Sequence, residues 1–372
     1  MRKHDKYVDI YSSSGSKRKK KKEKLYQQTE NDIYSYSNKK TVSKNQYKGS
    51  NKKHYKQNQQ TSKKKKHPIR RTILIILALV LAVFVGLCIY IFSGLNTSDI
   101  TTDPSELGIR DGYESHGVEN IALFGVDSRD SSDTGRSDAI MILSVDRWHN
   151  SIKISSLLRD SRVKIDGHGY DKLAHAYAYG GPTLAMKTIN QNFDLDVQEY
   201  ITVNFEQLAD IIDAVGGIDL TITEEERVAT NGILASTPGI TTEEIKSSGT
   251  VHLNGQQATA YARIRKLDSD SMRASRQQTV LETVFNKIMD LSPLEYPSFI
   301  KDMLSLVETS LSYGDILSLA PVMLFGKPEF ESTTVPNDED DAAGQTISGV
   351  WYWDYDIDEA AERLHTFIYG ES

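Results

Sequence analysis

The sequence predicts an α/β fold in which helices flank a central mixed sheet, as a single extracellular domain preceded by one transmembrane helix. Short apolar runs of strand character alternate with amphipathic helical segments from about residue 118 onward, a pattern typical of a sheet covered by helices. A stretch of 21 uncharged residues, 72–92, comes before them. About 20 such residues are enough to span a bilayer as a helix.

Turn signals separate the predicted strands, which are residues 121–125, 138–145, 153–157, 199–204 and 218–222. Apolar residues at helical spacing predict helices at 205–215 and 277–289. Residues 174–181 are also compatible with a helix, and we expect it to stop at the Gly-Gly-Pro breaker at 180–182.

Residues 1–71 form a basic tail with 23 Lys and Arg against five Asp and Glu. Because the tail has few aliphatic residues to bury, we expect it to be disordered. The apolar stretch 72–92 starts too far from the N-terminus, and is too long, for a typical signal peptide. Basic residues precede it and acidic residues follow it. The positive-inside rule therefore predicts a single-pass protein of the cell membrane, with a cytoplasmic tail and an extracellular domain.

The predicted extracellular part is strongly acidic, with 21 Lys and Arg against 46 Asp and Glu, a net charge of −25. Such a surface disfavours nucleic-acid binding, and no nucleic-acid partner is expected. The only cysteine, Cys88, lies in the predicted membrane helix, which excludes an intrachain disulfide or an extracellular cysteine nucleophile. After the helix we expect a linker at 93–117, a catalytic domain at 118–328 and an acidic and aromatic extension at 329–372.

Four arginines fall within fourteen residues of this acidic domain: Arg263, Arg265, Arg273 and Arg276. Arg263 and Arg265 alternate as on a strand, whereas Arg273 and Arg276 are one helical step apart. Arginine presents a planar fork of donors that suits phosphate oxygens, so the cluster predicts a polyphosphate site. A solvated charged edge is the alternative, with nearby aspartates as local partners.

Three further charged clusters adjoin predicted strands, where the ligand loops of open α/β sheets tend to lie. They contain Asp127 with Arg129, Arg136 with Asp138, and Arg159 with Asp160. Each alone is typical of a turn or a local ion pair. Together with the first cluster they hold seven of the twelve arginines after residue 71. If they converge, Asp127 and Asp138 could bind Mg²⁺ together with phosphate oxygens, and the arginines could stabilise a phosphoryl-transfer transition state.

The sequence lacks the Walker A motif, the Gly-x-Ser-x-Gly elbow and the His-Glu-x-x-His motif. Nucleotide hydrolysis, serine hydrolysis and zinc proteolysis therefore have no marker here. His168, His175 and His252 are isolated in sequence, and we interpret them as surface or core histidines.

The order and spacing of several motifs resemble the LytR-CpsA-Psr family of bacterial cell-envelope proteins, from about residue 120 to 281. The motifs begin at Ile121, Gly135, Leu158, Lys172, Asp213, Leu253 and Tyr261. The resemblance implies a phosphotransferase that moves a glycopolymer, such as teichoic acid or capsular polysaccharide, from a polyprenyl-pyrophosphate carrier to a peptidoglycan acceptor. It also implies one membrane helix and an extracellular catalytic domain.

The resemblance further implies roles for individual residues. Arg159, Arg265, Arg273 and Gln277 match positions that hold the pyrophosphate, and Asp127 and Asp138 match positions that bind Mg²⁺. Arg129, Arg136, Arg263 and Arg276 fall in the same motifs and are expected to complete the site. Two other classes stay open: a non-enzymatic sensor of polyprenyl phosphates, and a membrane-bound regulator of transcription.

Overall fold

The computed structural model describes most of the chain from residue 68 onward. The described residues are 68–93, 95, 98, 103–111, 117–126, 135–265, 267, 270–292, 294–322 and 328–370. Nearly all of the expected basic tail lies outside these ranges, and so do Asp127 and Arg129.

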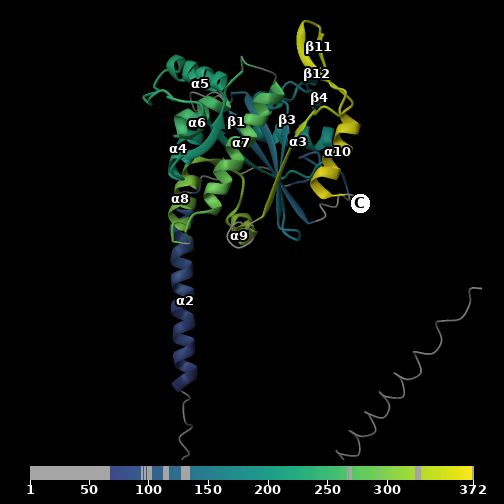
Figure 1. The fold of residues 1–372 in the computed structure, drawn as a ribbon. Helices are drawn as coiled ribbons and strands as arrows, with labels where there is room; N and C mark the ends of the chain where they lie inside the picture. Colours follow the sequence, from purple (N-terminus) through teal and green to yellow (C-terminus); the bar gives the residue numbers. More distant parts are fainter. Residues whose placement is uncertain are drawn as a thin grey trace, which may run out of the picture. The chain divides into compact units, whose positions relative to one another are not determined.

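Among the described residues, six strands form a central mixed sheet (Figure 1). In spatial order they are β10 (Glu329–Val335), β3 (Ser151–Leu157), β2 (Ser137–Asp146), β1 (Val118–Val126), β6 (Glu199–Asn204) and β9 (Glu308–Thr309). Strand β1 is parallel to β6, and β3 is parallel to β10, while β2 is antiparallel to both of its neighbours. Strands β1, β3, β6 and β10 therefore end at the same edge of the sheet, and β2 begins there.

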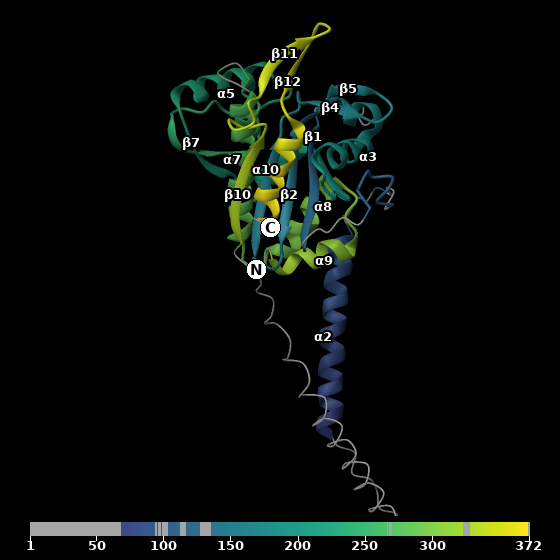
Figure 2. The ribbon, with the colours of Figure 1, turned by 90° about the vertical axis from the view of Figure 1, so that its right-hand side faces the viewer.

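Helices cover both faces of this sheet (Figures 1 and 2). On one face, Phe124 lies in a core that includes residues of α3 (Leu173–Phe193) and α10 (Ile357–Tyr369). On the other face, Ile152 lies in a cluster with Phe285 of α7 (Asp270–Met289). Both faces of the strands are buried, which accounts for their continuous apolar runs. The prediction of a mixed sheet flanked by helices is confirmed.

A second group of elements packs beside β6 around its own core. It comprises α4 (Phe205–Ala214), β7 (Ile218–Ile222), α5 (Glu224–Ser236), β8 (Gly249–Leu253), α6 (Gly255–Ala262) and α8 (Tyr296–Leu306). Asn204, Thr223 and Asn254 begin α4, α5 and α6, and each accepts a hydrogen bond from a backbone N–H of the first turn in a reciprocal capping box. These caps fix where the three helices start.

Two hairpins lie at the edge of the sheet where the parallel strands end. They are β4 (Arg162–Ile165) with β5 (Gly169–Lys172), and β11 (Ala343–Ile347) with β12 (Val350–Asp354). Figure 2 shows the β11–β12 hairpin (yellow) at the same end of the domain as β4 and β5. A backbone bridge between Ser161 and Trp353 joins the two hairpin regions. The segment expected as an extension thus supplies a sheet strand, a hairpin and a core helix.

The predicted helix stop at the Gly-Gly-Pro sequence is confirmed within α3, where two helical segments meet at a kink. The helix continues to Phe193, with non-helical backbone angles only at Gly180 and Gly181. Gly181 has a φ of 65°, which a residue without a Cβ adopts freely, and Pro182 begins the next helical turn. The first helical segment therefore ends at the breaker, and a second segment runs from Pro182 to Phe193.

The apolar stretch before the domain forms helix α2 (Pro68–Phe92). Its end contacts the domain: Lys301 of α8 lies over the ring of Tyr90, at 4.4 Å, and the rings of Phe92 and Tyr313 are 4.8 Å apart. Tyr313 begins α9 (Tyr313–Pro321). Within the described part of the chain, no helix meets the length and apolarity required to cross a membrane.

Candidate functional site

The candidate site lies at the edge where the parallel strands end. Arg159 follows β3, Phe205 follows β6, and Asp138 stands near the start of β2. In the β1–β2 ladder Gly125 pairs with Ala139 and Val126 with Ser137, so Asp138 is the unpaired residue of a β-bulge. Bulges re-aim side chains and often occur beside functional sites. Ligands of open α/β sheets bind at this kind of edge.

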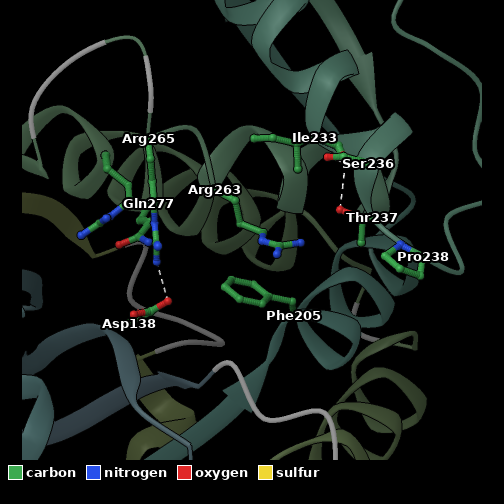
Figure 3. Close-up of a pocket in the computed structure, with 10 residues that line it drawn as sticks. Asp138, Phe205, Ile233, Ser236, Thr237, Pro238, Arg263, Arg265 and Gln277 are labelled. Atoms are coloured by element: carbon green, nitrogen blue, oxygen red, sulfur yellow. Dashed lines mark hydrogen bonds and ion pairs between the residues drawn. The ribbon is translucent and has the colours of Figure 1, made fainter.

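A cavity of about 280 Å³ opens beside these strand ends (Figure 3). It is lined by Asp138, Phe205, Ile233, Ser236, Thr237, Pro238, Arg263, Arg265, Arg273 and Gln277. Figure 3 shows Arg265, Gln277 and Asp138 at one end of this group and Pro238 at the other. One part of the lining is therefore cationic, and another offers apolar surface.

Asp138 joins two of the predicted arginines. Its Oδ1 lies 2.5 Å from Nη1 of Arg159, and its Oδ2 lies 2.5 Å from Nη2 of Arg265. The Arg159 and Asp138 side chains are 23% and 14% exposed, whereas Arg265 is 50% exposed. The pair with Arg159 is thus sheltered from water, and Arg265 keeps much of its guanidinium available to a ligand.

A second carboxylate, that of Asp160, binds the side of the Arg159 guanidinium that faces away from Asp138. Its Nε donates to Oδ2 of the buried Asp160 at 3.2 Å, and Nζ of Lys172 donates to Oδ1 of the same residue at 2.6 Å. A guanidinium bound at both Nε and Nη1 has little rotational freedom. Asp160 therefore acts as a positioning residue, which fixes Arg159 toward Asp138.

The arginines after α6 differ from the predicted arrangement. The expectation of strand geometry for Arg263 and Arg265 was wrong, because α6 continues to Ala262 and Arg263 has the backbone angles of a helix end (φ −94°, ψ 0°). The Arg263 guanidinium lies over the Phe205 ring, 4.5 Å from its centroid. Arg273 and Gln277 both line the cavity from one helix, α7, and Arg273 is buried.

Three of the described predicted arginines are not part of the cavity lining: Arg159, which pairs with Asp138, and Arg276 and Arg136. Arg276 is buried, and its Nε donates to Oε1 of Glu226, in the first turn of α5, at 2.9 Å. Its role among the described contacts is to hold α7 against α5. Arg136 is exposed and lies close enough to Tyr179 to act electrostatically on its hydroxyl.

Asp138 is the one carboxylate in the described lining of the cavity. The described residues contain no cluster of three or more His, Cys, Asp or Glu side chains that could hold a metal ion. Mg²⁺ is commonly bound through one or two carboxylates and substrate phosphates rather than by an all-protein cage. A carboxylate beside several arginines is compatible with that mode of binding.

Sequence reasoning missed half of the cavity. Phe205, Ile233, Ser236, Thr237 and Pro238 carry no charged motif, and the last four come from the end of α5 and the residues after it. One signal was available, because the Asn204 capping box fixes the start of α4 directly after a strand. Nothing in the local sequence places the end of α5 near Arg263.

The fold and the cavity together place arginines and apolar side chains at one edge of a mixed sheet, an arrangement that suits a ligand with an anionic group and an apolar portion. Comparison with known proteins is more specific: the LytR_cpsA_psr family profile matches residues 92–367. The chain belongs to this family.

Named relatives show the same relationship. The polyisoprenyl-teichoic acid–peptidoglycan teichoic acid transferase TagT of Bacillus subtilis is 33% identical over 207 residues, which cover 54% of this chain and 63% of that relative. TagU of Oceanobacillus iheyensis, whose name describes the same activity, is 33% identical over 267 residues, or 69% of this chain and 77% of the relative. The chain thus spans slightly less than two thirds of TagT and more of TagU.

Solved structures of the family have the same fold. The structure of YwtF (TagT) with bound octaprenyl pyrophosphate lipid superposes with a TM-score of 0.55 at 25% identity. The match covers 73% of this chain and 99% of that one. The lipid bound in that structure contains a pyrophosphate and an apolar chain.

Proposed function

We propose that the chain is a phosphotransferase that moves a glycopolymer from a polyprenyl-pyrophosphate carrier to peptidoglycan in cell-wall assembly. One observation carries the proposal: a single cavity combines Arg263, Arg265 and Arg273 with apolar side chains in a domain of net charge −25. Such a cavity suits a lipid pyrophosphate. The names of the relatives supply the donor and acceptor classes.

In the proposed reaction, a peptidoglycan hydroxyl attacks the phosphorus that bears the glycopolymer. A new P–O bond forms to the acceptor, the P–O bond to the bridging oxygen breaks, and polyprenyl phosphate leaves as the hydroxyl proton is lost to a base. Charge builds on the phosphate oxygens and on the leaving group. Arg159, Arg265 and Arg273, with Gln277, are the proposed donors to these oxygens, because preorganised donors stabilise such charge at low reorganisation cost.

Mg²⁺ is proposed as the cofactor, held by Asp138 and Asp127 together with pyrophosphate oxygens. Asp138 supports this proposal, because it lines the cavity and a carboxylate is a preferred ligand of this ion. When bound, the ion would neutralise charge on the pyrophosphate. Asp138 would then also keep Arg159 and Arg265 correctly spaced for the phosphate oxygens.

Residues 72–92 are proposed to anchor the protein in the cell membrane, with residues 1–71 in the cytoplasm and the catalytic domain outside. The uncharged sequence and the basic residues before it support this topology. The exposure of large apolar side chains along α2, such as Leu79 and Val83 at 61% and 71%, is also consistent with a lipid environment.

The proposal is tested with the full chain in detergent, a polyprenyl-pyrophosphate-linked glycan, peptidoglycan and Mg²⁺. The expected result is release of polyprenyl phosphate, with loss of release in Arg265→Ala and on addition of EDTA. Arg110→Ala is the matched control, because the Arg110 side chain is 66% exposed and pairs with Asp194 outside the cavity. Lipid binding without release by the wild type would instead favour a sensor.

A further inference from the structure

The two hairpins and the first part of α3 carry a group of aromatic side chains, which we call the aromatic platform. Its members are His168, Tyr170, Tyr179, Trp351 and Trp353. Tyr170 is 61% exposed, Tyr179 47% and Trp351 39%. The His168 and Tyr179 rings stack at 4.2 Å, and the two tryptophan rings meet edge to face at 5.2 Å. The platform therefore exposes large ring surfaces that the hydrophobic core does not use.

The Asp171 carboxylate connects the two regions that carry the platform, the β5–α3 region and strand β12. Oδ2 of Asp171 accepts from the Tyr179 hydroxyl at 2.6 Å and lies 2.8 Å from Nδ1 of His175, and Oδ1 accepts from the Tyr352 hydroxyl at 3.4 Å. Burial acts to raise the pKa of Asp171, but the hydrogen bonds from Tyr179 and His175 outweigh it and hold the pKa below its usual value. The β5–α3 region and the β11–β12 hairpin thus share one anionic centre.

The platform continues directly into the candidate site. Lys172 follows Asp171 in the chain, and its Nζ lies 5.9 Å from the Trp351 ring centre and 6.0 Å from that of Tyr352. The same Nζ donates to Asp160, which holds Arg159. A single set of contacts therefore runs from the exposed tryptophan to the arginine that binds Asp138.

The geometry of the proposed phosphoryl transfer indicates which of the two substrates lies near the platform. In an in-line phosphoryl transfer, the attacking and leaving oxygens lie on opposite sides of the phosphorus. The apolar lining, with Ile233 and Pro238, suits the leaving lipid, and Figure 3 places Pro238 at the opposite end from Asp138. The acceptor would then approach from the Asp138 side, where Arg159 and Lys172 connect to the platform.

We propose that the aromatic platform binds the glycan strand of the peptidoglycan acceptor; this inference rests on the proposed function. Sugar rings have faces of C–H bonds that pack on exposed aromatic rings, and rigid aromatic side chains bind at low entropic cost. Arg162 lies over the Tyr170 ring at 4.5 Å and pairs with Asp354 of β12 at 3.6 Å, so this ion pair connects the two hairpins beside the exposed Tyr170 ring. The platform holds the strand while a hydroxyl reaches the cavity.

The test uses the full chain in detergent and insoluble peptidoglycan stripped of wall polymers. Co-sedimentation measures binding without turnover, and the transfer reaction measures KM for the acceptor. Trp351→Ala and Tyr170→Ala are each expected to weaken binding and raise this KM by about tenfold, the typical effect of removing an interface aromatic residue. Octaprenyl pyrophosphate binding should stay unchanged, which shows that the variants are folded.

Trp148→Ala is the matched control, because Trp148 is 81% exposed but lies between β2 and β3 at the opposite edge of the sheet. Unchanged binding and KM in both Trp351→Ala and Tyr170→Ala would overturn the proposal while leaving the transferase function intact. An equal effect of Trp148→Ala would also overturn it. A third outcome separates the two proposals. If the wild type binds peptidoglycan but shows no transfer activity, and Trp351→Ala loses this binding, the platform is supported and the proposed function is contradicted.

Discussion

Nη1 of Arg159 lies 2.5 Å from Oδ1 of Asp138, although the two residues are 21 positions apart and belong to different segments of the sheet edge. The contact depends on two local features: the β-bulge that turns Asp138 out of the ladder, and Asp160, which binds the other side of the guanidinium. Together these two features fix the orientation of the planar Arg159 guanidinium.

Arg159→Lys is therefore expected to lower kcat about 100-fold, because an ammonium keeps the charge but cannot bind Asp138 and Asp160 together in this geometry. Steady-state release of polyprenyl phosphate measures the effect. Arg110→Lys, outside the cavity, should retain full activity. A kcat for Arg159→Lys within threefold of the wild type would show that the fork geometry is not needed.

Arg276→Ala should lower the stability of the protein, whereas Arg265→Ala should lower its activity. Arg276 is buried with Glu226, and breaking such a pair leaves a sheltered charge, so we expect a loss of about 3 kcal/mol in the free energy of unfolding. Arg265 is half exposed, so its removal should lower activity with little change in Tm. Thermal denaturation of both variants, followed by activity at low temperature, separates the two roles. Equal changes in Tm would contradict this division.

Gly255→Ala tests the packing that places the arginines after α6. A Cβ at Gly255 would lie 1.9 Å from the Ala209 carbonyl oxygen, so α4 and α6 would have to separate. We expect a loss of several kcal/mol, more than typical overpacking costs, together with loss of activity, because α6 leads to Arg263. In the interior of α5, Gly232 has no atom within 4 Å of its ideal Cβ, and Gly232→Ala should stabilise the protein by about 0.5–1 kcal/mol. Chemical denaturation compares the two.

Acid should loosen the aromatic platform. The pKa of Asp171 is lowered in the folded protein, so its ionised form adds stability above the unfolded pKa of about 3.9. That stability is lost as the pH falls from this value through the folded pKa. In a Trp148→Phe background, the remaining tryptophans are Trp351 and Trp353, and their fluorescence should change over this acid range. Asp171→Asn should remove the transition, and an unchanged transition would exclude Asp171 as its source.

The sequence was most informative where local pattern decides structure. Apolar runs located β1, β2, β3 and β6, and the arginine motifs located much of the cationic lining. It was least informative where distant segments meet. The partnership of Arg276 with Glu226, 50 positions away, has no local signal. The strand geometry expected for Arg263 failed because alternation over three residues also fits the end of a helix.

Strand β10 has a consequence for how the chain reaches its native state. It pairs along the whole of β3, the strand that leads to Arg159, yet it follows β3 by more than 170 residues. During synthesis from the N-terminus, β3 therefore has an unpaired edge until β10 has been made. Unpaired edges template aggregation, so a chain that stops before Glu329 would leave the edge of β3 open to pairing with another chain. The edge of β3 that leads to Arg159 is thus protected only by a segment made much later.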